Sequence, residues 1–300
     1  MSQRELTREY FNRIAGEWSE FAYGSSLAEF PGGRVRQEIV VQDLKRRGTR
    51  GRALDVGCGT GNLVRELADL GCEPLGIDLS PEMVAAAARS HPDLKDTFRC
   101  GDVMAWDPGS DFDVITAMGV LEYQEDGPGF VRRLAGILRH GGILFLESRN
   151  RLFNLFSSNQ YTLTEITEHR MPDLIRELEM VDRYSPVQEI SGDYLSGALM
   201  QLKEQLQVPD TTSAGTLPQR SYPAGMVRHQ YTPRELEELS ARAGCTLDYV
   251  VYYHIHPFLP RFERQFPQLF NALSLAYQPL GYTPLCATTG SSYVAVLTRR

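Results

Sequence analysis

Short apolar runs alternate with amphipathic segments through the first half of the chain. The apolar runs, most of them punctuated by glycine or aspartate, span residues 52–57, 73–78, 97–102, 112–120 and 142–148. Between them, 62–71 and 129–142 show helical spacing, and 80–90 begins with Ser80 and Pro81, which favour the N-cap and the first helical position. Nearly all-apolar strands alternating with helices are typical of a parallel sheet covered on both faces.

The chain before this alternation is predicted to be helical. Phe11, Ile14, Trp18 and Phe21 lie at helical spacing and predict one N-terminal helix. Residues 37–48 predict a second helix, which the glycine at its end would close.

The alternation stops after Arg149 and resumes near Arg228. The stretch between them holds two helical pieces and a loop rich in Pro, Gly, Ser and Thr. Regular elements then return as a capped helix at 231–244, a strand at 246–254, a helical region at 256–278 and a strand at 291–299. We therefore expect one α/β core, formed by 35–149 and 229–300, which an insertion at 150–228 interrupts.

Composition and charge narrow the classes of partner. Basic residues number 31 against 38 acidic ones, for a net charge of −7, which argues against a dedicated nucleic-acid binder. The five cysteines are scattered without a C-x-x-C pair, so neither a disulfide framework nor a zinc site is expected. With neither an apolar leader at the N-terminus nor an apolar run near 18 residues, we expect no membrane span and a cytoplasmic location.

The sharpest local signal is the segment LDVGCGTGNL at 54–63. Its glycines, Gly57, Gly59 and Gly61, follow a strand and open a helix, where bare backbone lets a ligand approach main-chain N–H groups. A dinucleotide fingerprint would need glycine one residue later, where the chain has Asn62. Asp78 ends the next strand, about where a carboxylate meets two ribose hydroxyls.

These segments, with GIDLSPEMV, CGDV and FDVITAMGVLEY in the same order, resemble the class I S-adenosylmethionine (SAM) methyltransferases. The resemblance is to the small-molecule branch that contains ubiquinone- and porphyrin-pathway enzymes. It covers roughly residues 35–149 well and extends more weakly to the last two strands. It implies a Rossmann-like seven-stranded sheet of order 3-2-1-4-5-7-6 whose last strand is antiparallel, with a mainly helical cap from the insertion.

The resemblance implies that the glycine loop holds the methionine part of SAM. Gly57, Cys58 and Gly59 would lie against it, and Cys58 is expected to be a small packing residue rather than a nucleophile. Asp55 would steady the loop or meet the amino group through water. The Met118 carbonyl would accept a hydrogen bond from the SAM ammonium.

The resemblance also implies how the adenosine is held. Asp78 would bind both ribose hydroxyls, and Leu79 would cover one face of the adenine. Asp102 would accept from the adenine amino group, while the Val103 N–H would reach a ring nitrogen. Taken alone, Asp78 and Asp102 are better interpreted as strand-end carboxylates in water; with the glycine loop at this spacing, the ligand-binding interpretation is favoured.

Residues outside the shared core would contact the methyl acceptor. In relatives the N-terminal helix, here 1–34 with Tyr23, folds over SAM as a lid, although a plain core helix is the alternative. Tyr161 and other aromatic residues of the insertion would line an apolar pocket or form the insertion's own core. Glu122 faces the same cleft in the family, and Arg149 either binds an acidic substrate group or caps a strand end.

A hydroxyl acceptor would require a general base. We expect His229 first and His169 second, because they lie where the insertion rejoins the core and within the cap. His254 and His256 form an H-x-H pair at a strand end, but no third ligand is suggested, so no metal is expected.

The sequence therefore predicts an enzyme that transfers a methyl group from SAM to a small organic acceptor, most often at oxygen, in biosynthesis of a secondary metabolite, quinone or sugar-like compound. N- or C-methylation, RNA or protein methylation, an NAD-dependent dehydrogenase and a SAM-binding regulator without activity are the alternatives. The aromatic stretch at 258–277 offers a face for a homodimer.

Overall fold

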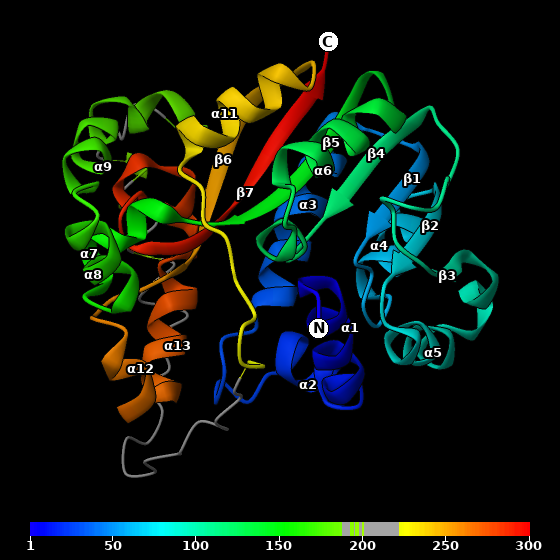
Figure 1. Ribbon diagram of the computed structural model, residues 1–300, viewed down its shortest axis with the longest axis horizontal. Helices are drawn as coiled ribbons and strands as arrows, with labels where there is room; N and C mark the ends of the chain where they lie inside the picture. Colours follow the sequence, from blue (N-terminus) through cyan, green and yellow to red (C-terminus); the bar gives the residue numbers. More distant parts are fainter. Residues whose placement is uncertain (188–192, 195, 198–199, 201–221) are drawn as a thin grey trace.

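The computed structural model describes residues 1–187, 193–194, 196–197, 200 and 222–300. Its centre is a seven-stranded sheet of order β3-β2-β1-β4-β5-β7-β6, which confirms the expected order (Figure 1). The strands are β1 Gly51–Val56, β2 Cys72–Asp78, β3 Phe98–Cys100, β4 Phe112–Ala117, β5 Leu138–Arg149, β6 Cys245–Ile255 and β7 Gly290–Arg299.

Strand direction decides where functional groups meet. Pairs β1–β2, β1–β4, β2–β3 and β4–β5 are parallel, while β7 runs antiparallel between β5 and β6. The six other strands therefore end at one edge of the sheet, where β7 begins. In an α/β sheet of this kind ligands bind beyond that edge, near the point where the strand order reverses.

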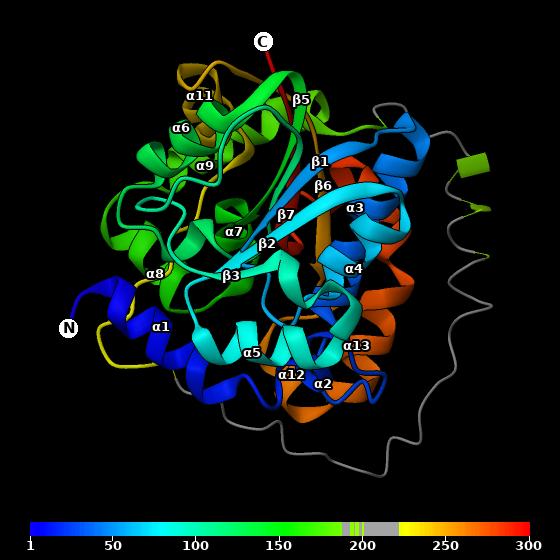
Figure 2. The ribbon, with the colours of Figure 1, turned by 90° about the vertical axis from the view of Figure 1, so that its right-hand side faces the viewer.

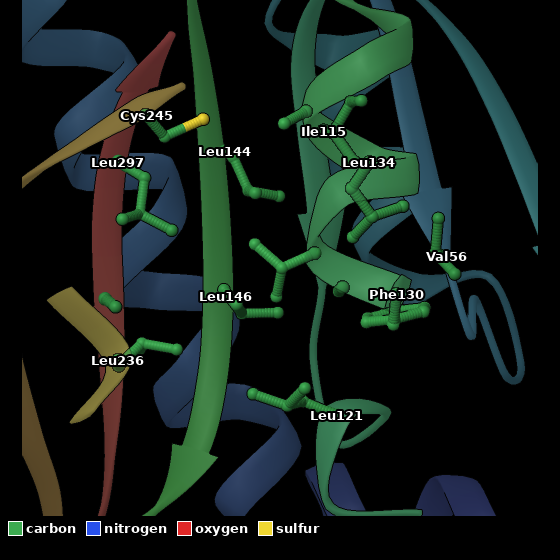
Figure 3. Close-up of a cluster of buried hydrophobic side chains, with 14 of the residues drawn as sticks. Val56, Ile115, Leu121, Phe130, Leu134, Leu144, Leu146, Leu236, Cys245 and Leu297 are labelled. Carbon is green, nitrogen blue, oxygen red and sulfur yellow. The ribbon is translucent and has the colours of Figure 1, made fainter. Parts of the chain in front are cut away.

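Helices cover both faces of the sheet (Figure 2). On one side lie α6 Gly127–Ile137 and α11 Pro233–Arg242, and on the other α3 Gly32–Arg47 and α4 Asn62–Asp69. Alternate strand residues face opposite helices: Leu144 and Leu146 pack with the α6 side, whereas Phe145 packs with the α3 side. Figure 3 shows the α6-side core, in which Phe130, Leu134 and Leu236 from the helices meet the sheet.

The N-terminal segment forms two helices, so the prediction of a single one is wrong. They are α1 Gln3–Ile14 and α2 Trp18–Tyr23. Gly16 lies in the turn between them, and glycine is a poor helix former. The turn folds the Trp18 ring back against Phe11, with ring centroids 5.6 Å apart. Helix α5, Pro81–Ser90, has the predicted cap: Ser80 Oγ accepts from the Met83 N–H at 3.1 Å.

The part of the insertion that precedes residue 188 packs beside α11. It comprises the short helices α7 Asn154–Ser157, α8 Gln160–Thr167 and α9 Met171–Glu177, followed by a 3₁₀ turn at Leu178–Tyr184. Arg151 pairs with Glu165 at 2.8 Å and also with Glu235 of α11. The second of the two helical pieces expected in the insertion, at 196–206, lies mostly outside the described residues.

The helical region expected at 256–278 is interrupted. It forms α12 Arg261–Gln265 and α13 Pro267–Ala276, because Pro267 has no N–H and begins a new helix rather than continuing the old one. Across the described ranges, no helix combines the length and the apolar character needed to cross a bilayer.

The α6-side core makes a direct stability prediction. Leu134 is fully buried, and truncating a buried leucine leaves a cavity. Leu134→Ala is expected to lower the free energy of unfolding by about 2–5 kcal/mol in urea titrations. Leu163→Ala is the matched control, since that leucine is 61% exposed on α8; equal losses in the two variants would contradict the assignment of this core.

Candidate functional site

A cavity of about 770 Å³ opens at the edge where the parallel strands end. Its wall includes residues that follow β1, β2, β3 and β4, together with the ends of β5 and β6. Among the sequence-predicted residues, those on the wall are Gly57, Gly59, Asp78, Leu79, Asp102, Val103, Met118, Glu122 and Arg149. The topology therefore gathers in one hollow side chains that are far apart along the chain.

The glycine loop needs its glycines for two reasons. Gly57 and Gly61 have φ of 75° and 82°, a region that glycine enters at little cost. A Cβ on Gly61 would lie 2.7 Å from the Phe98 ring, and one on Gly57 would collide with Val120. The loop is thus fixed by packing behind it, while the backbone of Gly57 and Gly59 faces the cavity.

Asp78 links this loop to the next strand. Its carboxylate accepts the Gly59 N–H at 2.9 Å and the Ser80 N–H at 2.8 Å. Burial raises the pKa of Asp78, and the backbone N–H donors oppose that rise. The carboxylate oxygens keep further lone pairs on the cavity wall, so they can accept hydroxyl donors from a ligand.

Asp102 occupies the wall beyond β3. One of its oxygens accepts the Met104 N–H at 2.9 Å, and the other lies 3.1 Å from Arg4 Nε of α1. Val103 and Leu79 add apolar surface beside it. This corner combines an acceptor with apolar walls, as a flat heterocycle with an exocyclic amine requires.

Asp55 and Cys58 lie behind the loop rather than on the cavity wall. Asp55 is buried, and the Thr116 hydroxyl donates to it at 2.7 Å. Burial raises the pKa of Asp55 to about 7, with Asp78 adding to the rise. Cys58 packs with Val64 and Phe98, and burial raises the pKa of its thiol well above the usual range. The expectation that Cys58 is a packing residue fits this environment.

The N-terminal helices and residues 222–228 cover the cavity together. Tyr10 stacks on Tyr222 at 4.8 Å, and Gln3 exchanges two hydrogen bonds with the backbone of Val227, at 2.6 and 3.0 Å. In the described part of the insertion, Tyr222 and Arg228 are the residues that line the cavity. The N-terminal helices therefore share the covering of the cavity with Tyr222, one of the insertion's aromatic residues that the sequence suggests for an apolar pocket.

A buried charged network that the sequence analysis missed stands at the β5–β6 side. Arg36 Nη1 of α3 donates to Glu147 Oε2 at 2.9 Å, and the Tyr253 hydroxyl donates to Glu147 Oε1 at 2.6 Å. All three residues line the cavity. The signal was present in the sequence, because a glutamate inside the apolar run at 142–148 needs a partner if it is buried.

Glu122 lies near two arginines without a direct hydrogen bond. Its Oε2 is 3.8 Å from Arg149 Nε and 3.9 Å from Arg228 Nε. Within the described residues, this oxygen and Arg149 Nε are buried without a hydrogen-bond partner. Burial raises the pKa of Glu122 although both arginines oppose it. Polar groups in this state are poised to bind a polar ligand.

Four other predicted residues lie off the described cavity wall. Tyr161 borders it, with the Arg149 guanidinium 5.6 Å from its ring centre. Tyr23 lies against Gly33, and burial raises its pKa to about 12. The His229 N–H donates to the Glu122 carbonyl at 2.8 Å, whereas His169 is exposed at the end of α8. The catalytic assignment of the two histidines stays a prediction.

Sequence comparison finds a family model for this chain. A methyltransferase-domain model matches residues 33–250. The ubiquinone biosynthesis O-methyltransferase of Xanthomonas euvesicatoria pv. vesicatoria (strain 85-10) is 41% identical over 155 residues, covering 50% of this chain and 62% of the relative. Its counterpart from Rhodopseudomonas palustris (strain BisB5) is 38% identical over 109 residues, covering 35% and 43%. The chain thus spans about half the length of the curated relatives it matches.

Solved structures share the fold at low identity. The magnesium protoporphyrin IX methyltransferase of Synechocystis PCC 6803 with bound SAH superposes with a TM-score of 0.57 at 15% identity, with both chains fully covered. The [4+2]-cyclase SpnF gives a TM-score of 0.55 at 17% identity, covering 100% of this chain and 97% of that one. Since the same fold serves a cyclase, these likenesses establish architecture rather than chemistry. The family match over most of the chain, on a sheet with the strand order expected for it, shows that this chain belongs to the methyltransferase domain family.

Proposed function

We propose that this protein is a SAM-dependent methyltransferase that acts on a small organic acceptor, most often at an oxygen atom. The supporting observation is a single cavity with two different halves. Backbone at Gly57 and Gly59 with the acids Asp78 and Asp102 forms one half, and Glu122 with its arginines belongs to the other. A methyl transfer needs a donor and an acceptor in one water-poor space.

The donor half suits a cationic adenosyl compound. Asp78 would accept both ribose hydroxyls, and Asp102 would accept the adenine amino group once Arg4 moves or shares it. Leu79 and Val103 would cover the base. The Met118 carbonyl would accept from the ammonium of the methionine part, with Asp55 behind the loop supplying negative charge. Because SAM carries a sulfonium, nearby acids favour it over a phosphate-bearing dinucleotide.

The acceptor half suits a compound with an acidic or hydroxyl group. Arg149 and Arg228 would hold an anionic group, with Tyr161 flanking Arg149. Burial raises the pKa of Glu122, which makes its carboxylate a stronger base than an exposed one, and it would take the proton from an acceptor hydroxyl. The remaining chemistry is alignment, since the sulfonium methyl is already activated and needs in-line approach of the nucleophile.

The proposal includes a homodimer and a cytoplasmic location. The aromatic stretch around α12 and α13 exposes Phe258 at 49% and Phe266 at 48%, which supports a second copy packing there. Five free thiols, four of them buried, support a reducing, cytoplasmic compartment.

The proposal is tested by supplying donor and candidate acceptors together. Labelled SAM is incubated with the protein and a panel of phenols, hydroxy acids and amines, and labelled products are counted by chromatography. Transfer to phenols or hydroxy acids is expected. Binding of SAH without any transfer would favour the SAM-binding regulator, transfer to nitrogen would favour the N-methyltransferase, and NADH binding without SAH binding would favour a dehydrogenase.

Asp78→Ala is expected to weaken SAH binding by about 10²–10⁴-fold, because two charge-assisted hydrogen bonds of about 1.5–3 kcal/mol each are lost. Isothermal titration calorimetry measures the affinity. Asp69→Ala removes a carboxylate that is 59% exposed on α4 and serves as control. Unchanged affinity in Asp78→Ala would show that the ribose lies elsewhere.

Asp55→Asn is expected to change how stability depends on pH. The pKa of Asp55 is about 7 in the folded chain and about 3.9 in an unfolded one, so wild-type stability falls as pH rises through that window. The variant has no carboxylate to ionise at this position, so at pH 8 its free energy of unfolding is expected to exceed that of wild type by up to about 4 kcal/mol. Urea unfolding of ligand-free protein from pH 4 to 8 measures it. If the free energy of unfolding depends on pH in the same way in wild type and variant, the raised pKa of Asp55 is refuted.

Glu122→Gln is expected to cut methyl transfer to a hydroxyl acceptor about 10²–10⁴-fold while SAH affinity stays within a few-fold, because only proton removal is affected. The rise of turnover with pH through the raised pKa of Glu122 should also disappear. Glu238→Gln on the exposed face of α11 is the control. If His229→Ala shows the loss and Glu122→Gln does not, His229 is the base.

A further inference from the structure

Two histidines and a glutamate converge at the β6 side of the cavity. His254 and His256 end β6, and Glu263 lies in α12. One ligand atom from each lies within 4.8 Å of the others. His254 Nε2 and Glu263 Oε1 are 3.4 Å apart. We propose that these three residues bind one divalent transition-metal ion at the acceptor end of the cavity.

His256 has no hydrogen-bonding role within the described structure. It is 5% exposed, and neither ring nitrogen has a hydrogen-bond partner among the described residues. Its ring lies against Phe153 at 4.6 Å and against the edge of Phe270 at 5.0 Å, so its position is fixed by packing. A buried imidazole with two unpartnered nitrogens is rare, because buried polar groups are normally hydrogen-bonded.

His254 is held in an orientation that leaves one nitrogen available. Its φ of 49° is in the left-handed region, which is uncommon for non-glycine residues and takes the backbone out of the regular strand conformation. The ring stacks on Phe30 at 4.2 Å, and Nδ1 lies 3.1 Å from the Ser291 hydroxyl. A second nitrogen fixed by a hydrogen bond is the usual support of a metal-binding histidine, and here it leaves Nε2 toward Glu263.

The donor set selects the class of metal. Two imidazoles and one carboxylate suit zinc or iron(II), and such sites leave coordination positions open. Ligand bonds of about 2.0–2.2 Å place neighbouring ligand atoms about 3–3.5 Å apart, which the His254–Glu263 separation already matches. The three ligand atoms lie within 4.8 Å of one another, so the ion would draw His256 closer to the other two ligands.

The open positions face the acceptor. His254 and Glu263 line the cavity, while His256 lies behind them. A dication balanced by one carboxylate leaves net positive charge beside Arg264, which lines the same wall. Resting on the proposed function, we infer that the ion binds an acceptor through an anionic oxygen such as a phenolate or carboxylate.

Cobalt(II) titration of metal-free protein tests the site. We expect visible d–d absorption that saturates at one equivalent and is displaced by zinc(II). His256→Ala and Glu263→Gln should each weaken cobalt binding by about 100-fold or more. Substituting a residue that only hydrogen-bonds to a metal ligand already lowers metal affinity about 10–100-fold. His140→Ala removes an exposed histidine far along the chain and should leave the titration unchanged.

Three results would overturn the inference. They are no saturable cobalt binding, binding that Glu263→Gln and His256→Ala leave unchanged, and equal affinity for magnesium. The first two would leave a simple His254–Glu263 ion pair. Because Glu263→Gln changes a residue of a short surface helix, it remains informative if His256→Ala fails to fold. SAH affinity measured on the same samples separates the metal-site proposal from the proposed function. If the protein binds SAH but not cobalt, only the metal-site proposal is contradicted.

Discussion

The arrangement of this protein depends on holding buried and half-buried carboxylates at the edge where its parallel strands end. Asp55, Asp78, Glu122 and Glu147 all lie at this edge, and an ionised carboxylate out of water needs donors or cations around it. Each is met differently: Asp78 by backbone N–H groups, Asp55 by the Thr116 hydroxyl, and Glu147 by Arg36 and the Tyr253 hydroxyl. Glu122 is left with arginines beyond hydrogen-bond distance.

Because the carboxylates differ in how fully their hydrogen-bonding needs are met, the cavity has a rigid part and an adjustable part. Where backbone N–H groups already hold the acid, the geometry is fixed before a ligand arrives, as a cofactor shared by many reactions would require. Where a glutamate and two arginines remain loosely paired, the site can adjust to an acceptor. The raised pKa values of Asp55 and Glu122 reflect the free-energy cost of burying an ionised carboxylate, because burial without enough donors or cations favours the neutral acid. A cationic donor would relieve that cost at Asp55.

Much of this was predictable from the sequence, and the exceptions have physical reasons. The strands, the capped helices and the glycine loop follow from local rules, and the family resemblance supplied the strand order. The break at Gly16 was missed because the apolar spacing on either side continues smoothly across it. Glu147 was read as part of an apolar strand, although its charge was the clue. Arg36 and Tyr253 carried no local signal, since they become partners of Glu147 only when α3, β5 and β6 assemble.

The same reasoning explains why the metal site proposed above was not predicted from the sequence. The pair His254 and His256 was visible, but a strand alternates its side chains, so neighbouring ligands at i and i+2 share one face and need a third group from another element. Here the backbone leaves the regular strand conformation at His254. The chain then returns through α12, which places Glu263 Oε1 3.4 Å from His254 Nε2. No fixed spacing predicts such a return. Chemistry that is distinctive to one member of a shared fold is therefore expected where the elements outside the common sheet edge meet it.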